Sequence, residues 1–521
     1  MPLQHLGPAQ GCARARGNAR IPLFIKHHHL PLIVTLVSLC CGNICPAASA
    51  SAAAPYAVLD PASFAPLLGD DLAWAASTAP LFEASDAALT RAFALRLRVL
   101  RSHIHETGLA DPGLRLVITE FSPDVPWAGL ANTIPCAAGH HLAEARWLRN
   151  TSVAESYSRW WVSNVEGVRH NYYSWLLTAV RDRLRVEGAA ALPLVASLLP
   201  NASAILRSYA RGELPQNAGF VAAADCLWNA PGNEGQENSI SGSGCRPLTQ
   251  SMLYSESQAL SELCAAAGND TCAAEFAAEA ARWRARTLAL WNPELASFDT
   301  LRIASPDPPP PSPPPPMPRG YALMPLLNNS FCCDQSPCVG GQSTFLFSGE
   351  VPPAQCAALC SADARCSFAT VSAAGWCMNA QFCNATNPFA GSQAWTFARN
   401  SAPRAWPRAA APYQPRAAAP PAFAGVRELA SLSSPWLFGA VPAENASLYA
   451  PSWAAAFDPE GLLGQFGLRT AERRHPQFSC AASGCCAWNG PSWPFETSKL
   501  IRAAIDVLQD GALAAQVPQL K

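Results

Sequence analysis

Two tryptophans, Trp488 and Trp493, stand five residues apart on either side of a Gly-Pro pair in the run WNGPSWPFETS at 488–498. The flat C–H face of a sugar ring packs well on an aromatic side chain, and Asn489 and Glu496 in the same run carry polar groups that can bind hydroxyls. The alternative is a turn in the core that buries both tryptophans. These residue types therefore predict a carbohydrate-binding segment.

Five further motifs occur in the order in which one glycosidase group has them. They are GHHLAEARWLR at 139–149, YSWL at 173–176, EGQENSI at 234–240, LWNPE at 290–294 and TAERRHP at 470–476. Together with the 488–498 run they resemble the six-hairpin, (α/α)6-toroid glycoside hydrolases, in particular the mannosylglycerate-hydrolase-like group related to glycoside hydrolase family 63. The resemblance covers residues 120–301 and 424–521 and implies a saccharide or glycoside substrate. We expect no cofactor.

The resemblance assigns the general acid to the loop at 234–238. The related families have an acidic residue in a loop reading S-G-x-D-N, and here EGQEN matches it with Glu237 in the acidic position. The alternative is a solvated loop glutamate. We predict that Glu237 is catalytic, and that it shares a substrate-binding site with the residues Trp228, Asn238, Arg246, Glu472, Arg473, Trp488, Asn489, Trp493 and Glu496.

Inverting hydrolysis also needs a carboxylate that activates water, about 6.5–9.5 Å from the acid. In the resembling families this base lies on a late loop that is followed by the helices that close the toroid. Lys521 is the last residue here, and no residue matches that base. We therefore expect an incomplete toroid, from a truncated sequence or a degenerate relative, with weak saccharide binding and little hydrolysis. Glu472 and Glu496 are the first candidates if a base is present.

The cysteines and the N-terminus predict an oxidising compartment. The chain has 20 cysteines without paired C-x-x-C spacing, which is typical of disulfides. A basic leader, an apolar run at 30–41 and small residues at 47–52 are typical of a signal peptide or, alternatively, a signal anchor over residues 1–52. We expect no other membrane-spanning stretch. The predicted location is therefore outside the cell or in the lumen of the secretory pathway.

Six sequons fit that location as glycosylation sites. They are at Asn150, Asn201, Asn269, Asn328, Asn384 and Asn445. The net charge of −1 argues against a nucleic-acid partner, because no basic stripe is available to neutralise phosphates. The pair His140-His141 has no carboxylate or cysteine at ligand spacing, so we expect packed histidines and no metal site.

Apolar residues recur at a spacing of three and four along much of the chain, which predicts amphipathic helices. The expected helices run over about 86–100, 156–188, 193–211, 250–267, 272–290 and 499–515. The expected fold is mainly α, an incomplete (α/α)6 toroid, although a plain helical bundle would give the same pattern.

A proline-rich segment interrupts the helical pattern and is followed by a cysteine cluster. Prolines dominate 306–318, which predicts an extended polyproline linker. A short cysteine-rich unit needs disulfides because it buries little core. The disulfide candidates are Cys332, Cys333, Cys338, Cys356, Cys360, Cys366, Cys377 and Cys383. Their order, with a closing AWTF at 394–397, resembles the PAN/apple module, which implies a small disulfide-rich α+β domain that binds protein or carbohydrate.

These observations divide the chain into seven parts. They are 1–52, the signal peptide or anchor; 53–119, an N-terminal region; 120–301, the first part of the glycosidase-like domain; 302–320, the Pro-rich linker; 321–398, the apple-like domain; 399–423, an Ala/Pro-rich linker; and 424–521, the second, truncated part of the glycosidase-like domain. The predicted function is a secreted, inverting glycoside hydrolase that acts on α-linked sugars. A non-catalytic carbohydrate-binding or adhesion glycoprotein is the alternative.

Overall fold

The computed structural model describes residues 59–125, 128–214, 218–303, 317, 321–323, 330–333, 346–350, 352–372, 376–381, 385–388, 394–399, 420–480 and 487–520. The predicted signal peptide or anchor and nearly all of the proline-rich segment lie outside these residues.

Helices make up most of the described chain. The α-helices are α2 (Ala65–Leu68), α3 (Leu72–Thr78), α4 (Ala87–Ser102), α5 (Ala138–Ala145), α6 (Ser152–Trp161), α7 (Leu176–Glu187), α8 (Leu192–Arg211), α9 (Pro247–Ala266), α10 (Asp270–Leu288), α11 (Pro353–Ala362), α12 (Leu429–Leu437), α13 (Ala446–Tyr449), α14 (Ala454–Phe457), α15 (Pro494–Gln509) and α16 (Gly511–Gln516). This confirms the prediction of a mainly helical fold. Closure of the helices into a toroid stays a prediction.

The strands are short. They are β1 (Ile104–Glu106), β2 (Leu116–Ile118), β3 (Gly219–Val221), β4 (Cys226–Asn229), β5 (Gly244–Cys245), β6 (Trp291–Asn292), β7 (Ser297–Phe298), β8 (Leu301–Arg302), β9 (Tyr321–Leu323), β10 (Ser330–Cys333), β11 (Phe347–Glu350), β12 (Phe368–Ser372), β13 (Trp376–Ala380), β14 (Ala385–Pro388), β15 (Ala394–Arg399) and β16 (Ala422–Phe423).

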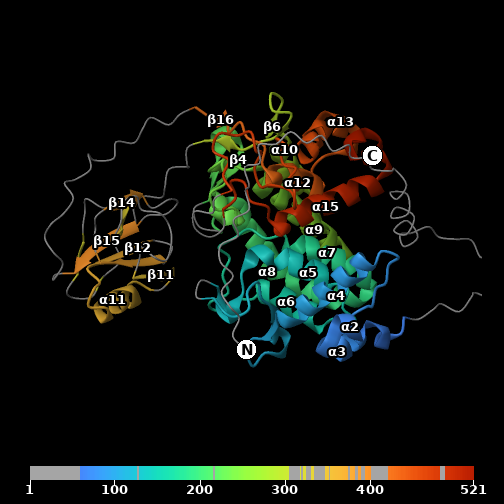
Figure 1. Ribbon diagram of the computed structural model, residues 1–521, viewed down its shortest axis with the longest axis horizontal. Coiled ribbons are helices and arrows are strands. Elements are labelled where there is room, and N and C mark those ends of the chain that lie inside the picture. Colours follow the sequence, from blue (N-terminus) through green and yellow to red (C-terminus); the bar gives the residue numbers. More distant parts are fainter. Residues whose placement is uncertain are drawn as a thin grey trace, which may run out of the picture.

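Helix α9 lies at the centre of the helical body (Figure 1). Nearly every residue from Pro247 to Leu260 is buried, including polar ones such as Gln250 and Glu256. A helix that is buried on all sides needs neighbours all round, and α9 contacts α7, α8, α10 and α12. Helix α12 in turn contacts α15. The helices after residue 424 therefore pack directly on those before residue 301.

The predicted helix over 156–188 is two helices. The apolar spacing continues in phase, but the chain leaves the helix between α6 and α7, where Gly167 has a φ of +90°. Only glycine adopts that conformation readily, so the helix cannot run through. The buried carboxylate of Glu256 accepts the backbone N–H groups of Leu177 and Thr178, each at 2.8 Å, and so caps the start of α7.

One helical run meets the length and hydropathy criteria for a membrane span, contrary to our expectation. It covers 176–211, joins α7 and α8, and has a mean hydropathy of 1.7 in its most apolar window. Both helices contact α9 in the core of the body. Core helices of soluble proteins meet the same criteria, so the run is weak evidence for a membrane span.

A five-stranded antiparallel sheet in the order β16-β8-β5-β4-β3 joins the two parts of the helical body. A disulfide between Cys226 and Cys245 ties β4 to β5. Strand β8 ends just before the long insertion and β16 begins just after it, and the two pair with each other. The inserted residues therefore leave and re-enter the body at neighbouring strands.

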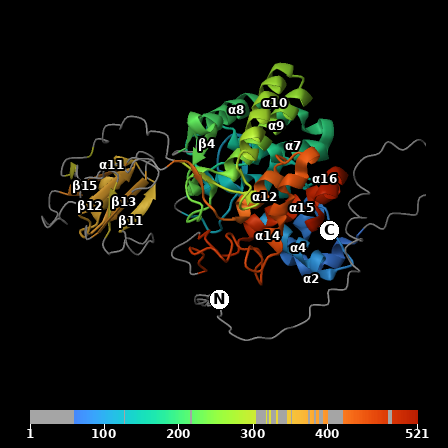
Figure 2. The same cartoon turned by 90° about the horizontal axis from the view of Figure 1, so that it is seen from above.

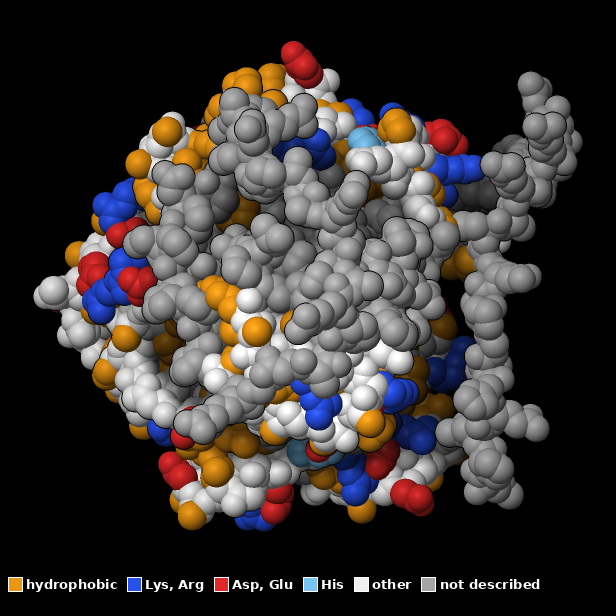
Figure 3. All heavy atoms as spheres, turned by 90° about the vertical axis from the view of Figure 1, so that its left-hand side faces the viewer, with side chains coloured by type: hydrophobic (Ala, Val, Ile, Leu, Met, Phe, Trp, Pro, Cys, Tyr) orange, Lys and Arg blue, Asp and Glu red, His pale blue; other side chains and the backbone are white. Residues whose placement is uncertain are grey.

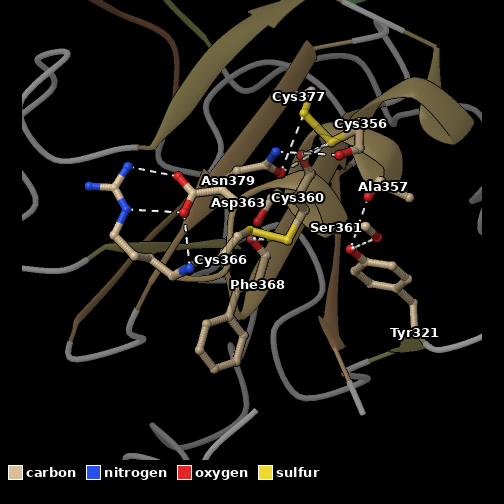
Figure 4. The surroundings of a disulfide bond; sticks show 12 residues. Tyr321, Cys356, Ala357, Cys360, Ser361, Asp363, Cys366, Phe368, Cys377 and Asn379 are labelled. Atoms are coloured by element: carbon tan, nitrogen blue, oxygen red, sulfur yellow. Dashed lines mark hydrogen bonds and ion pairs between the residues drawn. A yellow bond between two sulfur atoms is a disulfide. The ribbon is translucent and has the colours of Figure 1, made fainter. Parts of the chain in front are cut away.

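The inserted residues form a lobe that stands beside the helical body in Figures 1 and 2. Its sheet has the order β11-β13-β12-β15-β9 and carries α11. Two disulfides, Cys356–Cys377 and Cys360–Cys366, pin α11 to the sheet region (Figure 4). The hydroxyl of Tyr321 on β9 also donates to the backbone oxygen of Ala357 at 3.0 Å.

Four of the eight predicted disulfide candidates therefore form disulfides. Cys338, Cys383 and the side chains of Cys332 and Cys333 lie outside the described part of the lobe. A second pair in the helical body, Cys264–Cys272, joins the end of α9 to the start of α10. These disulfides fit an oxidising compartment.

Candidate active site

Glu237 lies in the segment between β4 and α9, before the two-residue strand β5. The loop begins with the short helix η8 (Pro231–Glu234), and then Gly235 and Asn238 adopt left-handed backbone conformations with φ of +66° and +63°. Glycine and asparagine are the residues that tolerate this conformation best. The two turns leave Glu237 half-buried and Asn238 exposed.

Arg246, at the end of the loop, binds the loop from inside. Its Nε donates to Glu234 at 2.6 Å, and its two Nη atoms donate to Gln236 at 2.7 Å and to Ser241 at 2.9 Å. The arginine side chain is 2% exposed. The structure therefore places Arg246 as a clamp for the loop that carries Glu237, and its donors are occupied by protein groups.

Glu428 holds the same loop from the other side of the insertion. Its buried carboxylate accepts the hydroxyls of Ser239 and Ser241 at 2.7 Å each and the backbone N–H of Ser241 at 3.0 Å. Arg302 on β8 donates to the backbone oxygens of Ile240 and Ser241. Both ends of the insertion therefore contact the loop of Glu237.

The structure brings residues 488–493, here called the tryptophan segment, beside Glu237, although the two are far apart in the chain. The backbone N–H of Trp488 donates to the backbone oxygen of Glu237 at 3.0 Å. The rings of Trp488 and Trp493 stack on each other, with centroids 5.6 Å apart and an interplanar angle of 7°. The Nε1 of Trp493 donates a hydrogen bond to the backbone oxygen of Ala487 at 2.9 Å. Asn489 follows Trp488, and its buried Oδ1 has no partner among the described residues.

Two residues that the sequence analysis missed lie at the same site. The thiol of Cys136 donates to Glu120 at 3.6 Å, and a Cβ on Gly235, two residues before Glu237, would lie 3.9 Å from the Cys136 sulfur. Among the described cysteines, Cys136 is outside any disulfide. The sequence offers one clue to Glu120, because this charged residue follows shortly after the apolar residues of β2.

Burial and mutual repulsion change the ionisation of these groups. Burial, and to a smaller extent the negative charge of Glu120, raise the pKa of Glu237 to about 7. Burial also raises the pKa of Glu120, while the hydrogen bond from Cys136 opposes that shift. The pKa of the Cys136 thiol is raised well above its usual value by burial and by the charges of Glu120 and Glu237. The site therefore holds an acid, Glu237, that is still substantially protonated near neutral pH.

Glu496 lies behind the tryptophan segment. Its fully buried carboxylate accepts from Ser433 at 2.5 Å and from Lys499 at 2.9 Å. The Lys499 ammonium also lies over the ring of Phe495, 4.4 Å from its centroid. These bonds occupy the Glu496 carboxylate within the core that supports the segment.

Glu472 and Arg473 do not act together. Glu472 is buried and accepts the backbone N–H and the guanidinium of Arg427, each at 3.0 Å. The half-exposed Arg473 instead pairs with Glu460 at 3.3 Å. The 470 loop does lie against the tryptophan segment, because the hydroxyl of Thr470 accepts the backbone N–H of Gly490 at 3.0 Å.

Trp228 is part of the small sheet. It is 7% exposed, sits on β4, and its Nε1 donates to the backbone oxygen of Ile303 at 3.0 Å. The contacts of Trp228 are thus to the sheet, and they do not place it against Glu237.

The two histidines pack as expected from the sequence. His140 lies against Phe495, with ring centroids 4.4 Å apart, and burial lowers its pKa well below the usual value. The Nδ1 of His141 lies 3.0 Å from the hydroxyl of Tyr157, and burial lowers the His141 pKa to about 3. Both rings are therefore neutral near pH 7. The described residues contain no group of three His, Cys, Asp or Glu side chains that could hold a metal ion.

Two cavities formed by described residues lie away from Glu237. A small one of about 20 Å³ lies in the helical core beside Glu256 and Tyr209, and a larger hollow of about 530 Å³ lies between α9 and α10. Glu237 lines neither of them. On the face that carries the lobe, positive and negative side chains are interspersed around the edge (Figure 3), in line with the balanced net charge.

The predicted glycosylation sites differ in accessibility. Asn150, Asn269 and Asn445 are exposed. Asn201 lies within α8, half-buried, and its Nδ2 donates to the backbone oxygen of Val162 at 2.8 Å. In the folded protein that nitrogen is occupied. Asn328 and Asn384 lie outside the described residues.

Comparison with known protein families finds a match that includes most of the helical body. A family model, described as the mannosylglycerate hydrolase MGH1-like glycoside hydrolase domain, matches residues 131–326 and 386–519, which is more than half of the chain. This match confirms the predicted resemblance to mannosylglycerate-hydrolase-like glycosidases. No curated protein matches the chain.

Solved structures give more distant similarities. A sialidase is 19% identical, with a TM-score of 0.55, over 87% of this chain and 31% of the sialidase chain. The chain therefore spans about a third of that protein's length, and the similarity concerns the fold alone. A GH63 mannosylglycerate hydrolase from Thermus thermophilus in complex with glucose and an uncharacterized conserved protein from the same organism are each 11% identical, with TM-scores of 0.41 and 0.42, over 81% of this chain and 88% of theirs.

Proposed function

Because this chain belongs to the mannosylglycerate hydrolase MGH1-like glycoside hydrolase family, we propose that it is a glycoside hydrolase in which Glu237 is the general acid. The observation that carries this proposal is the half-buried Glu237, whose pKa is raised to about 7 and whose backbone oxygen accepts the N–H of Trp488 in the tryptophan segment. A general acid works best when its pKa lies near the working pH. The proposed reaction is inverting and acts on α-linked sugars.

In the proposed step one proton is transferred and the glycosidic bond breaks. Glu237 gives its proton to the glycosidic oxygen while the bond from that oxygen to the anomeric carbon breaks, and water attacks from the opposite face. Burial chiefly favours the protonated form of Glu237, and the negative charge of Glu120 adds to this because it disfavours ionisation.

The tryptophan segment is the proposed sugar-binding element. Trp488 and Trp493 supply apolar surface, and the unpartnered Oδ1 of Asn489 is able to accept a bond from a sugar hydroxyl. Asn238 is exposed next to Glu237 and is the second proposed polar contact.

We place the protein outside the cell or in the secretory lumen. The disulfides in the helical body and in the lobe support this, since such bonds persist in oxidising surroundings. The lobe is the proposed apple-like module, supported by the helix α11 that two disulfides pin to a small antiparallel sheet. Its proposed ligand is a protein or a carbohydrate.

The pH dependence of hydrolysis tests the electrostatic part of this proposal. Since the general acid must be protonated, kcat/KM should fall as the pH rises above about 7. Glu120→Gln removes a negative charge and should lower the pKa of Glu237, so the falling limb should move to lower pH. The measurement is kcat/KM from pH 4 to 9 on a panel of α-linked oligosaccharides and alkyl glycosides.

The exposed Glu83 provides a matched control, because Glu83→Gln makes the same chemical change on the surface. An unshifted limb in Glu120→Gln would show that Glu120 does not act on Glu237. Saccharide binding by the wild type without release of any product from the panel would favour the non-catalytic alternative.

A further inference from the structure

The hollow between α9 and α10 is lined by none of the residues that take part in the proposed reaction. It has a volume of about 530 Å³, and η11 (Ala443–Asn445) with the preceding proline closes one side. Its lining residues are Tyr254, Gln258, Ser261, Glu262, Ala277, Ala280, Ala281, Arg284, Ala285, Leu288, Pro442, Glu444 and Asn445.

The chemistry of this lining suits a short saccharide. Four alanines of α10 leave an apolar floor without bulk, and the Tyr254 ring is stiffened by the Arg284 guanidinium, which lies 5.6 Å from its centroid. Gln258 and Glu444 add polar groups at the edge. Sugars bind to such mixed surfaces, with ring faces on apolar atoms and hydroxyls on polar ones. Hollows of about 300–1,000 Å³ hold compact ligands, so the volume is in the right range.

One member of the lining is also an acceptor for sugar. Asn445 is exposed and begins the sequon Asn445-Ala446-Ser447. We propose that this hollow is the seat of the protein's own N-linked glycan, attached at Asn445, whose first sugars pack on α9 and α10. The inference rests on the proposed secretory location and is independent of the role of Glu237.

The attachment itself is an ordinary group transfer. The Nδ2 of Asn445 loses a proton and forms a bond to C1 of the first N-acetylglucosamine, and the lipid diphosphate of a lipid-linked oligosaccharide leaves. This takes place during secretion. The proposal adds a later step, in which the attached sugars leave water and cover the four alanines of α10 that line the hollow.

Other sequons provide internal comparisons. Asn150 is exposed and does not line this hollow, so a glycan there would stay in solvent. The matched changes are Ser447→Ala and Ser152→Ala, because each removes a sequon at an exposed serine and keeps the asparagine.

The test is the rate at which a peptide-N-glycosidase removes each glycan from the native full-length glycoprotein, produced in a eukaryotic secretory host and read by glycopeptide mass spectrometry. We expect release at Asn445 to be at least about tenfold slower than at Asn150, the ratio that a protection of about 1.4 kcal/mol gives. After denaturation the two rates should become equal.

Thermal unfolding gives a second readout. Ser447→Ala should lower the Tm of the secreted glycoprotein, Ser152→Ala should not, and the Tm of Ser447→Ala and wild type should agree when both are made without glycans in a bacterial periplasm. An unoccupied Asn445, or equal native release rates at Asn445 and Asn150, would overturn the proposal.

Discussion

Glu237→Gln is expected to reduce hydrolysis of alkyl glycosides by about 10²- to 10⁴-fold, the usual contribution of a positioned proton donor. The amide cannot give a proton to the leaving oxygen. The fold should stay intact, because the contact of Glu237 with Trp488 is made by its backbone oxygen, which glutamine keeps. The measurement is kcat/KM of the variant and the wild type, with equal thermal unfolding as the check on folding.

The leaving group separates this loss from a general loss of binding. A glycosyl fluoride needs no proton to depart, so Glu237→Gln should keep most of the wild-type rate on that substrate. Glu83→Gln should behave as wild type on both substrates, since Glu83 is exposed. An equal loss on the fluoride and on alkyl glycosides would assign Glu237 to binding rather than to proton transfer.

Azide tests the expectation that no base is present. Azide attacks carbon without losing a proton, so it needs no base. In the wild type it should therefore raise turnover and give a glycosyl azide. Unchanged turnover with azide, together with fast hydrolysis in water, would show that a base is already in place. The electrostatic partner of Glu237, Glu120, would then be the first residue to replace, because Glu472 and Glu496 are held by Arg427 and Lys499.

Local patterns in the sequence predict the structural features that depend on residues close together in the chain. The spacing of apolar residues predicts α4, α8 and α10 within a few residues because one buried face fixes a helix, and it also predicts α9, which is buried on all sides. The order of the motifs led to the proximity of Glu237 and Trp488, although nothing between them in the chain indicates it. The disulfides that hold α11 are predicted from the small size of the lobe, because so small a unit needs such bonds.

Long-range partners explain the parts that the sequence could not show. Arg246 was assigned to substrate because a sequence shows a charge and not what surrounds it. Its environment includes Glu428, which follows the insertion and approaches to 4.0 Å. Glu496 was likewise assigned to sugar, although Ser433 and Lys499 occupy it. Glu120 gave only a weak signal, since a charge at the end of a strand is common on protein surfaces.

Arg246→Met is expected to lower the free energy of unfolding by about 3–5 kcal/mol, the cost of removing one partner from a buried ion pair. The change leaves Glu234, whose side chain is fully buried, without its cation, and it leaves Glu428 with serine partners only. Methionine has a similar length, so lost volume contributes little. Arg246→Lys should be intermediate, because a single ammonium cannot bind Glu234, Gln236 and Ser241 together as the planar guanidinium does.

The measurement is urea-induced unfolding followed by tryptophan fluorescence, with Arg115→Met as the matched control. Arg115 pairs with Glu106 at 2.5 Å, but both side chains are more than 60% exposed, so its loss should cost less than about 1 kcal/mol. If Arg246→Met and Arg115→Met cost the same, the buried network would not hold the loop. If Arg246→Met stays folded but loses hydrolysis on alkyl glycosides and fluorides alike, Arg246 contacts the substrate after all. The large loss of stability is expected because Glu234 would keep only the hydrogen bonds from Thr249 and would remain a buried carboxylate without a cation.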